Sequence, residues 1–375
     1  MKKFLSLVLA LVMTMSLVTV SAGAKDFADD SKITYKEAVD VMSAAKVIDG
    51  YAEGDFRPST TLTRGAAAKI ICNLILGPTT AGALVADAAP YKDVPTNHTF
   101  AGYIAYCQKE GIISGYADGT FRPANSLTGY AFMKMLLGAL GYDAEVEGYT
   151  GPNWSVNVAK RALNIGLADD LNGEFNGVKA VNREEACLYA LNTLTADMVE
   201  YDAKTTVSTN GTTVVIAGSK AKEMVNNGNT DGKIFTKDGV MQFAEKYFDN
   251  LTVKTGSDDF SRPANVWKVK AEEIGTYTNT PDASYTKKVE VGDIYKDLGL
   301  GSKIEKKNVS VYVDGVANAS QPAYAITKGD DANKYGDNGV LTEVFYDDDA
   351  ETVTITEINT YIGSINKTVK ATDKK

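Results

Sequence analysis

An internal repeat constrains what this chain can fold into. Residues 48–58 read IDGYAEGDFRP and residues 113–123 read ISGYADGTFRP, so eight of eleven positions are identical at an offset of 65. An apolar stretch follows each copy, at residues 66–76 and 131–140. A third, more divergent copy starts at Trp154. A single unit of this kind cannot bury its apolar face alone, so three units are expected to share one core.

Each unit reads as a helix, a glycine-rich loop and a second helix. In the second copy, apolar residues at 100, 103, 104 and 107 recur at helical spacing and predict a helix over residues 100–110. Gly111 is placed to end this helix. Gly115 and Gly119 bracket a tight turn, in which a positive φ favours glycine.

The second helix of a unit follows a residue suited to the N-cap. Thr63 holds this position in the first copy and Asn182 holds it in the third. Asn182 and Glu185 have the spacing of a capping box. The third copy lacks the GYxxG turn but keeps the helix start Asn182-Arg183-Glu184-Glu185.

The N-terminus reads as an export signal. Lys2 and Lys3 precede an apolar run at residues 4–20, and Ser21-Ala22-Gly23-Ala24 supplies small residues for cleavage. We expect residues 1–24 to be a signal peptide; a retained membrane anchor is the alternative. No later stretch is apolar for 18 residues, so no membrane segment is expected after cleavage.

Composition excludes several function classes. The chain has one histidine, His98, which argues against Ser-His-Asp or Cys-His hydrolases and multi-histidine metal sites. Its formal net charge of −9 argues against nucleic-acid binding. Cys72, Cys107 and Cys187 each fall on an apolar helix face and are expected to be buried free thiols. His98 precedes a helix, where a surface or capping role is expected.

The repeat resembles the S-layer homology domain. That family carries three tandem copies of an aromatic-x-Asp opening, a helix, a Gly-Ile-x-x-Gly-x-x-Asp-Gly-x-Phe-x-Pro loop and a Thr-Arg-Ala-Glu helix start. Phe27-Ala28-Asp29 and Tyr91-Lys92-Asp93 match the opening, and residues 111–123 match the loop throughout. The resemblance covers residues 25–200, in copies at about 25–80, 88–142 and 149–200.

The resemblance implies a fold and a function. It implies three helical units around a pseudo-threefold axis, with grooves between them. Such domains hold exported proteins on the cell wall by binding secondary cell-wall polysaccharide, which often carries pyruvate ketals. The arginine of the Thr-Arg-Ala-Glu start is central to the groove.

This chemistry is physically reasonable. A guanidinium matches a ketal carboxylate with two parallel charge-assisted hydrogen bonds, and a helix N-terminus can add backbone donors. Aromatic side chains can stack on sugar rings. The residues expected to bind polysaccharide are the helix-start residues Arg64, Arg183, Thr63 and Asn182, the opening aspartates Asp29 and Asp93, the aromatic residues Tyr51, Tyr116 and Trp154, and the loop arginines Arg57 and Arg122.

The chain departs from the family pattern at the helix starts. The first copy reads Thr63-Arg64-Gly65-Ala66, which keeps the arginine and loses the glutamate. The second reads Thr128-Gly129-Tyr130-Ala131 and has no arginine. We therefore expect at most two full-strength grooves, at Arg64 and Arg183.

Structural roles remain open for several of these residues. Arg64 and Arg183 could instead pair with carboxylates of a neighbouring unit. Tyr51 and Tyr116 could pack under their loops, and Trp154 could be a packing anchor. Phe56 and Phe121 are expected to be core residues.

Residues 201–375 have a different composition and are expected to form a β-rich domain of unknown role. Short β-like runs occur at residues 212–217, 251–255, 266–269 and 309–313. Residues 341–346 and 352–359 read as a hairpin, and residues 240–248 predict one helix. The expected fold class is therefore α + β in separate domains, a three-fold helical repeat domain followed by a β-rich domain.

The second half offers little chemistry. Asp331 and Asn333 fit the first positions of a calcium loop, but Tyr335 and Thr342 do not fit the fifth and twelfth. Residues 347–349, three aspartates, read as a solvated turn. No pair of carboxylates is singled out for glycoside hydrolysis. We expect no catalytic residue and no metal site, and no cofactor beyond the partial calcium pattern.

Three hypotheses follow. The first is a non-enzymatic surface protein that the repeats anchor to secondary cell-wall polysaccharide and that self-associates in a surface lattice. The second is a wall-anchored hydrolase with its activity in residues 201–375. The third is an adhesin or ligand-binding module in the same half.

Overall fold

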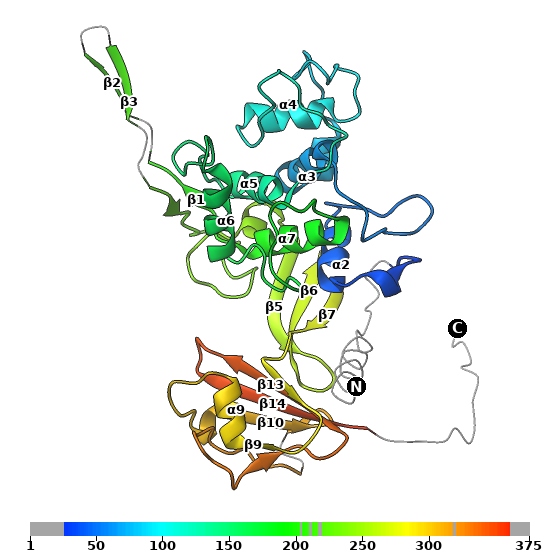
Figure 1. Ribbon diagram of the computed structural model, residues 1–375, viewed down its shortest axis with the longest axis vertical. Helices are drawn as coiled ribbons and strands as arrows, with labels where there is room; N and C mark the ends of the chain where they lie inside the picture. Colours follow the sequence, from blue (N-terminus) through cyan, green and yellow to red (C-terminus); the bar gives the residue numbers. More distant parts are fainter. Residues whose placement is uncertain (1–25, 203–204, 210–211, 217–219, 318–319, 361–375) are drawn as a thin grey trace. The chain divides into compact units, whose positions relative to one another are not determined.

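The computed structural model describes residues 26–202, 205–209, 212–216, 220–317 and 320–360; the predicted signal peptide lies outside these ranges (Figure 1). The chain divides into two compact units. The helical unit contains the described residues through Lys254, together with Val266–Gly275. The β unit contains Thr255–Asn265 and the described residues from Thr276 onward. The helical unit thus extends past residue 200, where the composition changes.

The helices of the helical unit come in pairs along the chain. The helix expected at residues 100–110 spans Ala101–Lys109. In each of three pairs, the first helix is shorter than the second, and a loop joins them. A short 3-10 turn, η1 (Asp30–Lys32), precedes them, and the α-helices are α2 (Lys36–Ala44), α3 (Arg64–Gly82), α4 (Ala101–Lys109), α5 (Gly129–Ala139), α6 (Trp154–Asn164), α7 (Arg183–Thr195) and the short α8 (Phe243–Tyr247).

The N-caps explain where the second helices begin. The Thr63 hydroxyl accepts the Ala66 N–H at 3.3 Å, and Thr128 accepts the Ala131 N–H at 3.4 Å. Asn182 and Glu185 form the expected capping box at the start of α7. The predicted N-caps at Thr63 and Asn182 are therefore confirmed.

The first helices end in a left-handed residue. Gly111 has φ +72° after α4, and Gly166 has φ +75° after α6. In the first copy, Lys46 takes the same conformation at φ +61°. This turn lets a backbone N–H reach back to the helix, as when Ile112 donates to the Cys107 carbonyl at 2.9 Å.

Three backbone hydrogen bonds close a ring at the centre of the helical unit. The Leu62 N–H donates to Val181 O (2.8 Å), Val181 N–H to Leu127 O (3.0 Å), and Leu127 N–H to Leu62 O (2.9 Å). These residues precede α3, α7 and α5, and each side chain is 2% exposed. The ring therefore ties three chain segments that are far apart in sequence to one another.

Helix contacts follow the same cyclic order. α3 packs on α4, α5 on α6, and α7 on α2. The second helix of one pair thus contacts the first helix of the next, and the last pair returns to the first. Phe56 and Phe121 are fully buried under their loops, which confirms them as core residues. Burying a side chain of this size stabilises the fold by about 1.5–3 kcal/mol.

Further elements complete the helical unit. Two short strands, β1 (Val199–Glu200) and β4 (Lys222–Glu223), pair antiparallel, as do β2 (Thr205–Thr209) and β3 (Thr212–Ile216). The predicted helix over 240–248 is shorter than expected. It begins only at Phe243 because Val240 forms a β-bridge with Val225 and Gln242 is the N-cap.

A three-stranded sheet has the strand order β5-β6-β7. Its strands span Leu251–Ser257, Pro263–Val269 and Glu272–Thr278. They contain the predicted β runs at 251–255 and 266–269. In the helical unit, Trp267 of β6 is 1% exposed and donates its indole N–H to Glu37 of α2 at 2.6 Å.

The β unit is built on a five-stranded sheet. Strand β10 runs parallel to β14, and the other neighbours are antiparallel. Strands β9 (Val289–Glu290) and β12 (Lys334–Tyr335) form a separate two-stranded sheet, and η2 spans Lys306–Asn308. The sheet order is β11 (Val316–Ala317), β10 (Val309–Val313), β14 (Thr352–Asn359), β13 (Val340–Asp347) and β8 (Ala283–Tyr285).

Helix α9 (Val291–Asp297) packs on this sheet, and sequence analysis did not predict it. Its Val291 and Ile294 join Val311, Val344 and Ile355 in one buried cluster. The predicted hairpin over residues 341–359 is confirmed as β13 and β14, with Asp347 opposite Thr352. Most helices of the described residues therefore lie in the first half of the chain, and most strands lie in the second.

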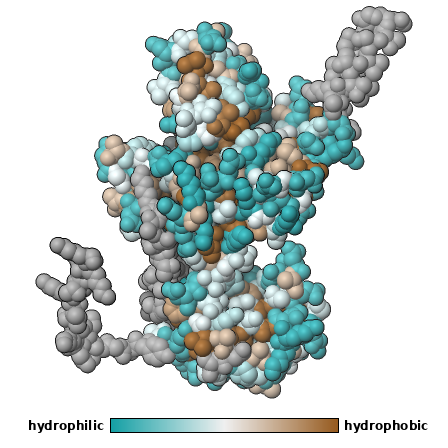
Figure 2. Space-filling model, turned by 180° about the vertical axis from the view of Figure 1, so that it is seen from behind, coloured by the Kyte–Doolittle hydropathy of each residue, from teal (hydrophilic) through white to brown (hydrophobic). Residues whose placement is uncertain are grey.

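The surface of the described residues is mixed. Figure 2 shows hydrophilic residues over much of one face, with hydrophobic residues in patches between them. Exposed apolar side chains, such as Val85 at 78% and Val178 at 72%, are few. No helix in the described ranges is long and apolar enough to cross a membrane.

Candidate functional site: two arginine-centred loop contacts and a groove

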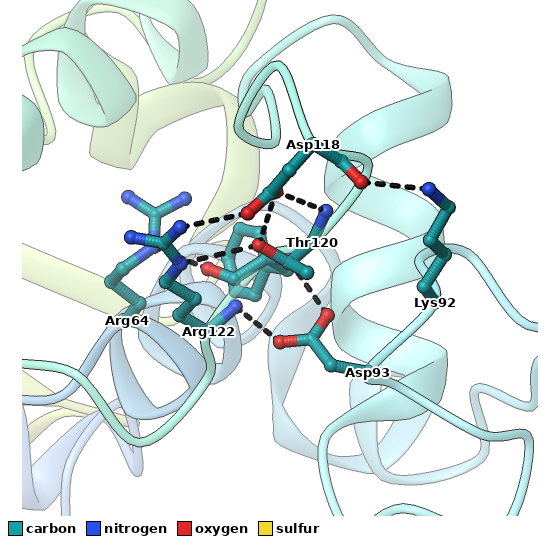
Figure 3. Close-up of polar contacts among 7 residues, drawn as sticks. Arg64, Lys92, Asp93, Asp118, Thr120 and Arg122 are labelled. Atoms are coloured by element: carbon teal, nitrogen blue, oxygen red, sulfur yellow. Dashed lines mark hydrogen bonds and ion pairs between the residues drawn. The ribbon is translucent and has the colours of Figure 1, made fainter.

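The opening aspartates hold the glycine-rich loops. Asp93 accepts the N–H groups of Phe121 and Arg122, both at 2.7 Å (Figure 3). Asp29 accepts the equivalent N–H groups of Phe56 and Arg57 at 2.7 and 2.8 Å. Partial burial raises the pKa of each aspartate, but these hydrogen bonds outweigh it and lower the pKa overall. Both carboxylates are thus engaged in shaping a loop.

The loop glycines serve two different purposes. Gly119 has φ +81°, as expected for the turn. Gly115 does not have a positive φ; a Cβ there would lie 2.3 Å from the Tyr91 ring. The expectation of a positive φ at Gly115 is therefore wrong, because close approach of an aromatic side chain is what requires glycine. Gly50 repeats this arrangement against Phe27, at 2.4 Å.

Arg64 reaches from the start of α3 to the loop of the second copy. Its Nε donates to the Phe121 carbonyl at 2.8 Å and one terminal nitrogen donates to the Ser114 carbonyl at 3.1 Å. The guanidinium carbon lies 4.3 Å from the centre of the Phe121 ring and 5.1 Å from that of Tyr116. Burial is the main cause that lowers the pKa of Arg64, which stays charged at physiological pH.

Arg183 makes the same contacts with the loop of the first copy. Its Nε donates to the Phe56 carbonyl at 2.9 Å and a terminal nitrogen donates to the Asp49 carbonyl at 2.7 Å. Its guanidinium carbon lies 4.6 Å from the Phe56 ring centre and 4.8 Å from that of Tyr51. Neither arginine forms an ion pair among the described residues, so the alternative of a carboxylate partner is not what the structure shows.

The loop arginines differ from the helix-start arginines. Arg57 pairs with Asp55 at 2.7 Å and Glu53 at 3.2 Å, and Arg122 pairs with Asp118 at 2.8 Å. Hydrogen bonds from Thr120 and Arg122 lower the pKa of Asp118 to about 2. The loop arginines also lie over the tyrosines: Arg57 is 4.0 Å from the Tyr51 ring centre and Arg122 is 4.1 Å from that of Tyr116.

The helix N-termini have fewer free donors than the sequence suggests. The Arg64 N–H donates to Asn125 O and the Gly65 N–H donates to Pro123 O, both at 2.9 Å. The N-cap Thr63 takes the next N–H. At α7, the N–H groups of Arg183 and Glu184 donate to the Thr60 and Pro58 carbonyls in the same way. The expectation that these N–H groups help to bind an anion is therefore wrong, because they already donate to carbonyl groups of the neighbouring loops.

A groove of about 410 Å³ opens beside Arg64. It is lined by the second-copy loop, by α5 and by the segment that leads into α6. Lys134 lies 5.7 Å from the Trp154 ring centre, and burial lowers its pKa. Two cations and several aromatic rings thus share one groove. Its polar and aromatic lining includes Arg64, Ser114, Tyr116, Lys134, Tyr149 and Trp154.

The second copy has no arginine to offer, as predicted. Gly129 occupies the helix-start position, and its N–H donates to the Lys179 carbonyl at 2.9 Å. A Cβ at Gly129 would lie 3.1 Å from Gly177 Cα and 3.2 Å from the Phe175 ring. Tyr130 stacks edge-on against Phe175 and Trp154, with ring centres 5.9 and 6.5 Å away. Aromatic packing replaces the cation here.

Two features of this region were not predicted from the sequence. Gly173, with φ +98°, and Phe175 take the positions of Gly119 and Phe121 in the third-copy loop, although the third copy lacks the GYxxG turn. The signal was the short G-x-F match at residues 173–175. Lys134 was also missed; a lysine at the matched position, Lys69, was the available signal.

Other predicted features have clear places. The three cysteines are buried and free, as expected. The His98 Nδ1 accepts the Phe100 N–H at 3.1 Å just before α4, in line with a capping role.

In the partial calcium pattern, the Asn333 amide donates to Asp330 at 2.8 Å, and Tyr335 is fully buried. No cluster of three or more potential metal ligands of the His, Cys, Asp or Glu type occurs in the described ranges.

The chain matches one known domain family and is similar to several named proteins. The sequence profile of the S-layer homology domain matches residues 26–68 and 90–129. The "Surface layer protein" of Brevibacillus choshinensis is 24% identical over 88% of this chain and 32% of its own length. The "Middle cell wall protein" of Brevibacillus brevis is 24% identical over 53% of this chain and 19% of its own. The "Cellulosome-anchoring protein" of Acetivibrio thermocellus is 36% identical over 22% of this chain and 19% of its own length.

The chain thus carries two segments that match the S-layer homology domain, at residues 26–68 and 90–129, and its similarity to surface-layer and cell-wall proteins supports a location at the cell-wall surface. It spans about a third of the length of the first of these relatives and about a fifth of the other two. Partial matches to proteins named as an endoglucanase and an amidase cover less than half of the chain.

Proposed function

We propose that residues 25–200 form three S-layer homology repeats, at about 25–80, 88–142 and 149–200, around a pseudo-threefold axis. The family profile matches the first two copies. The ring of hydrogen bonds through Leu62, Leu127 and Val181 supports a third, because each copy supplies one donor and one acceptor. The cyclic contacts α3 on α4, α5 on α6 and α7 on α2 support the same assignment.

The repeats would anchor the protein by binding secondary cell-wall polysaccharide at Arg64 and at Arg183. The observation that carries this proposal is that two guanidinium groups are held in the same way by two matched loops. In each, Nε and one terminal nitrogen are fixed by carbonyl oxygens. The orientation of the remaining donors is therefore set before a ligand arrives, which lowers the entropic cost of binding.

The ligand chemistry follows from the lining of the Arg64 groove. A carboxylate, such as a pyruvate ketal on a sugar, would pair with the guanidinium. Tyr116 and Trp154 offer faces for sugar rings, and Lys134 adds a second cation. Thr63, Asn182, Asp29 and Asp93 would act indirectly, since their side chains hold helix starts and loops. Arg57 and Arg122 would act through their contacts with Tyr51 and Tyr116.

For the second half, a structural role is the better-supported proposal, with self-association in a surface lattice. The named surface-layer relatives support it. A wall-anchored hydrolase or an adhesin is the alternative. In the described part of the β unit, two buried carboxylates, Asp258 and Glu343, are both bound by Arg262. That arrangement favours structure over acid–base catalysis.

The test is co-sedimentation of the exported chain with purified cell walls. Walls with and without their non-peptidoglycan polysaccharide would be compared, for the native chain and for Arg64→Ala, Arg183→Ala and the double variant. Lys303→Ala is the control, because Lys303 is an exposed cation of the β unit that pairs with Glu305 and does not line the Arg64 groove. We expect the native chain to pellet only with walls that keep their polysaccharide, and we expect the double variant to stay in the supernatant. Pelleting that survives in the double variant would overturn it.

A further inference from the structure

Two cysteines from different repeats meet in the core of the helical unit. The Sγ atoms of Cys72 on α3 and Cys107 on α4 are 3.6 Å apart. Both side chains are fully buried. Cys187 on α7 is also buried, but among the described residues no thiol contacts it. The chain therefore has one paired site and one isolated cysteine to compare with it.

The surroundings of the pair are nearly symmetrical. The Cys72 thiol lies 3.5 Å from the Tyr103 carbonyl of α4, and the Cys107 thiol lies 3.7 Å from the Ala68 carbonyl of α3. Each carbonyl belongs to the residue four positions before the partner cysteine. The two side chains thus project toward each other where the helices cross, and no side chain separates the sulfur atoms.

We propose that Cys72 and Cys107 form a disulfide bond that joins the first and second copies of the repeat. A disulfide requires an S–S distance of about 2.05 Å, so the sulfurs must approach by roughly 1.6 Å, a shift that side-chain rotation and small helix movements can supply. A protein at the cell surface lies outside the reducing cytosol, where disulfides persist.

The reaction is thiol–disulfide exchange with a small disulfide oxidant. The thiolate of one cysteine attacks the oxidant and displaces one of its thiols, leaving a mixed disulfide. The second cysteine then attacks the protein sulfur and displaces the other thiol. Together the cysteines lose two protons and two electrons, and the oxidant is reduced to two thiols.

Burial determines when this reaction takes place. The contact with Cys72, together with burial, raises the pKa of the Cys107 thiol, and the thiolate is the reactive form. The oxidant must therefore act before α3 and α4 have packed, during folding after export. Once formed, the bond is shielded from reductants. It closes a loop between positions 35 apart in sequence, which stabilises the fold by restricting the unfolded chain.

The test is refolding of the full exported chain from denaturant, with a mixture of oxidised and reduced glutathione or with reductant alone. Mass spectrometry of peptides would then map the cysteines after free thiols are alkylated. We expect a single disulfide between Cys72 and Cys107, with Cys187 alkylated. The oxidised chain should also show a Tm about 5–10 °C above that of the reduced chain.

Variants make the outcome specific. Cys187→Ala should keep the disulfide and the gain in Tm, whereas Cys72→Ala and Cys107→Ala should each lose both. Three free thiols after oxidative refolding, or pairing that involves Cys187, would overturn the proposal. A disulfide at the expected place that lowers Tm would overturn its stabilising role. None of these readouts uses polysaccharide, so they are independent of the anchoring function.

Discussion

Arg64 and Arg183 hold two loops in the same way, although 119 positions separate them in the sequence. The Nε of Arg64 donates to Phe121 O at 2.8 Å, and that of Arg183 donates to Phe56 O at 2.9 Å. Each guanidinium therefore links two copies of the repeat while keeping one edge for another partner. The same arginine serves the fold and the proposed binding site, so stability must be measured alongside binding in every arginine variant.

The second copy should not gain a binding site when its arginine is restored. In Gly129→Arg, the new Cβ would meet the Gly177 backbone at 3.1 Å and the Phe175 ring at 3.2 Å. We expect a loss of about 1–3 kcal/mol in unfolding free energy from overpacking, and no increase in wall binding. Urea unfolding and co-sedimentation would measure the two effects. Tighter wall binding at unchanged stability would contradict this account.

Removing the charge of a loop-holding aspartate should destabilise the helical unit. In Asp93→Asn, the amide can accept from only one of the Phe121 and Arg122 N–H groups and turns a donor toward the other. We expect a loss of about 1–3 kcal/mol in unfolding free energy. Asp87→Asn, at an exposed position, is the control and should change stability by less than about 0.5 kcal/mol. Equal stabilities of the two variants would show that Asp93 does not hold the loop.

The same aspartates predict a dependence of stability on pH. The folded pKa values of Asp29 and Asp93 lie below the reference value of 3.8. Their contribution is therefore fully present above that value and is lost as the pH falls through the folded pKa values. Acid unfolding followed by circular dichroism should shift to higher pH in Asp93→Asn. An unchanged acid transition would contradict the assignment.

In the β unit, Arg262 should matter more than either of its carboxylate partners. It pairs with Asp258 at 2.7 Å and with Glu343 at 3.2 Å, and all three side chains are buried. Arg262→Met leaves two buried carboxylates without a cation and should cost about 3–5 kcal/mol. Burial raises the pKa of Glu343, so Glu343→Gln should be close to neutral. Thermal unfolding of both variants measures this, and a larger loss in Glu343→Gln would refute it.

Much of the helical fold could be predicted from the repeat, because glycines, N-caps and apolar spacing each determine the structure of nearby residues. Thr63, Asn182, Gly111 and Gly119 all do what their positions predicted. The contacts between residues far apart in the sequence could not be predicted. No sequence pattern indicates that the Gly65 N–H donates to the Pro123 carbonyl. The sequence therefore suggested that the N–H groups at the start of α3 were free to bind an anion.

The second half was harder to predict because its elements are short. The hairpin β13–β14 was evident from alternation and from the three aspartates in its turn. Helix α9 was missed because its seven residues are too few to show a helical period. The approach of Arg262 to Glu343 joins positions 81 apart and left no local signal.

The most direct test of the anchoring account is a calorimetric titration of the full exported chain with purified secondary cell-wall polysaccharide. The account predicts saturable binding that falls about tenfold or more in Arg64→Ala, falls further when Arg183→Ala is added, and is unchanged in Lys303→Ala. Circular dichroism should show each variant folded. Removal of acidic substituents from the glycan should weaken binding to the native chain. Equal affinity of the native chain and the folded double variant would contradict the account.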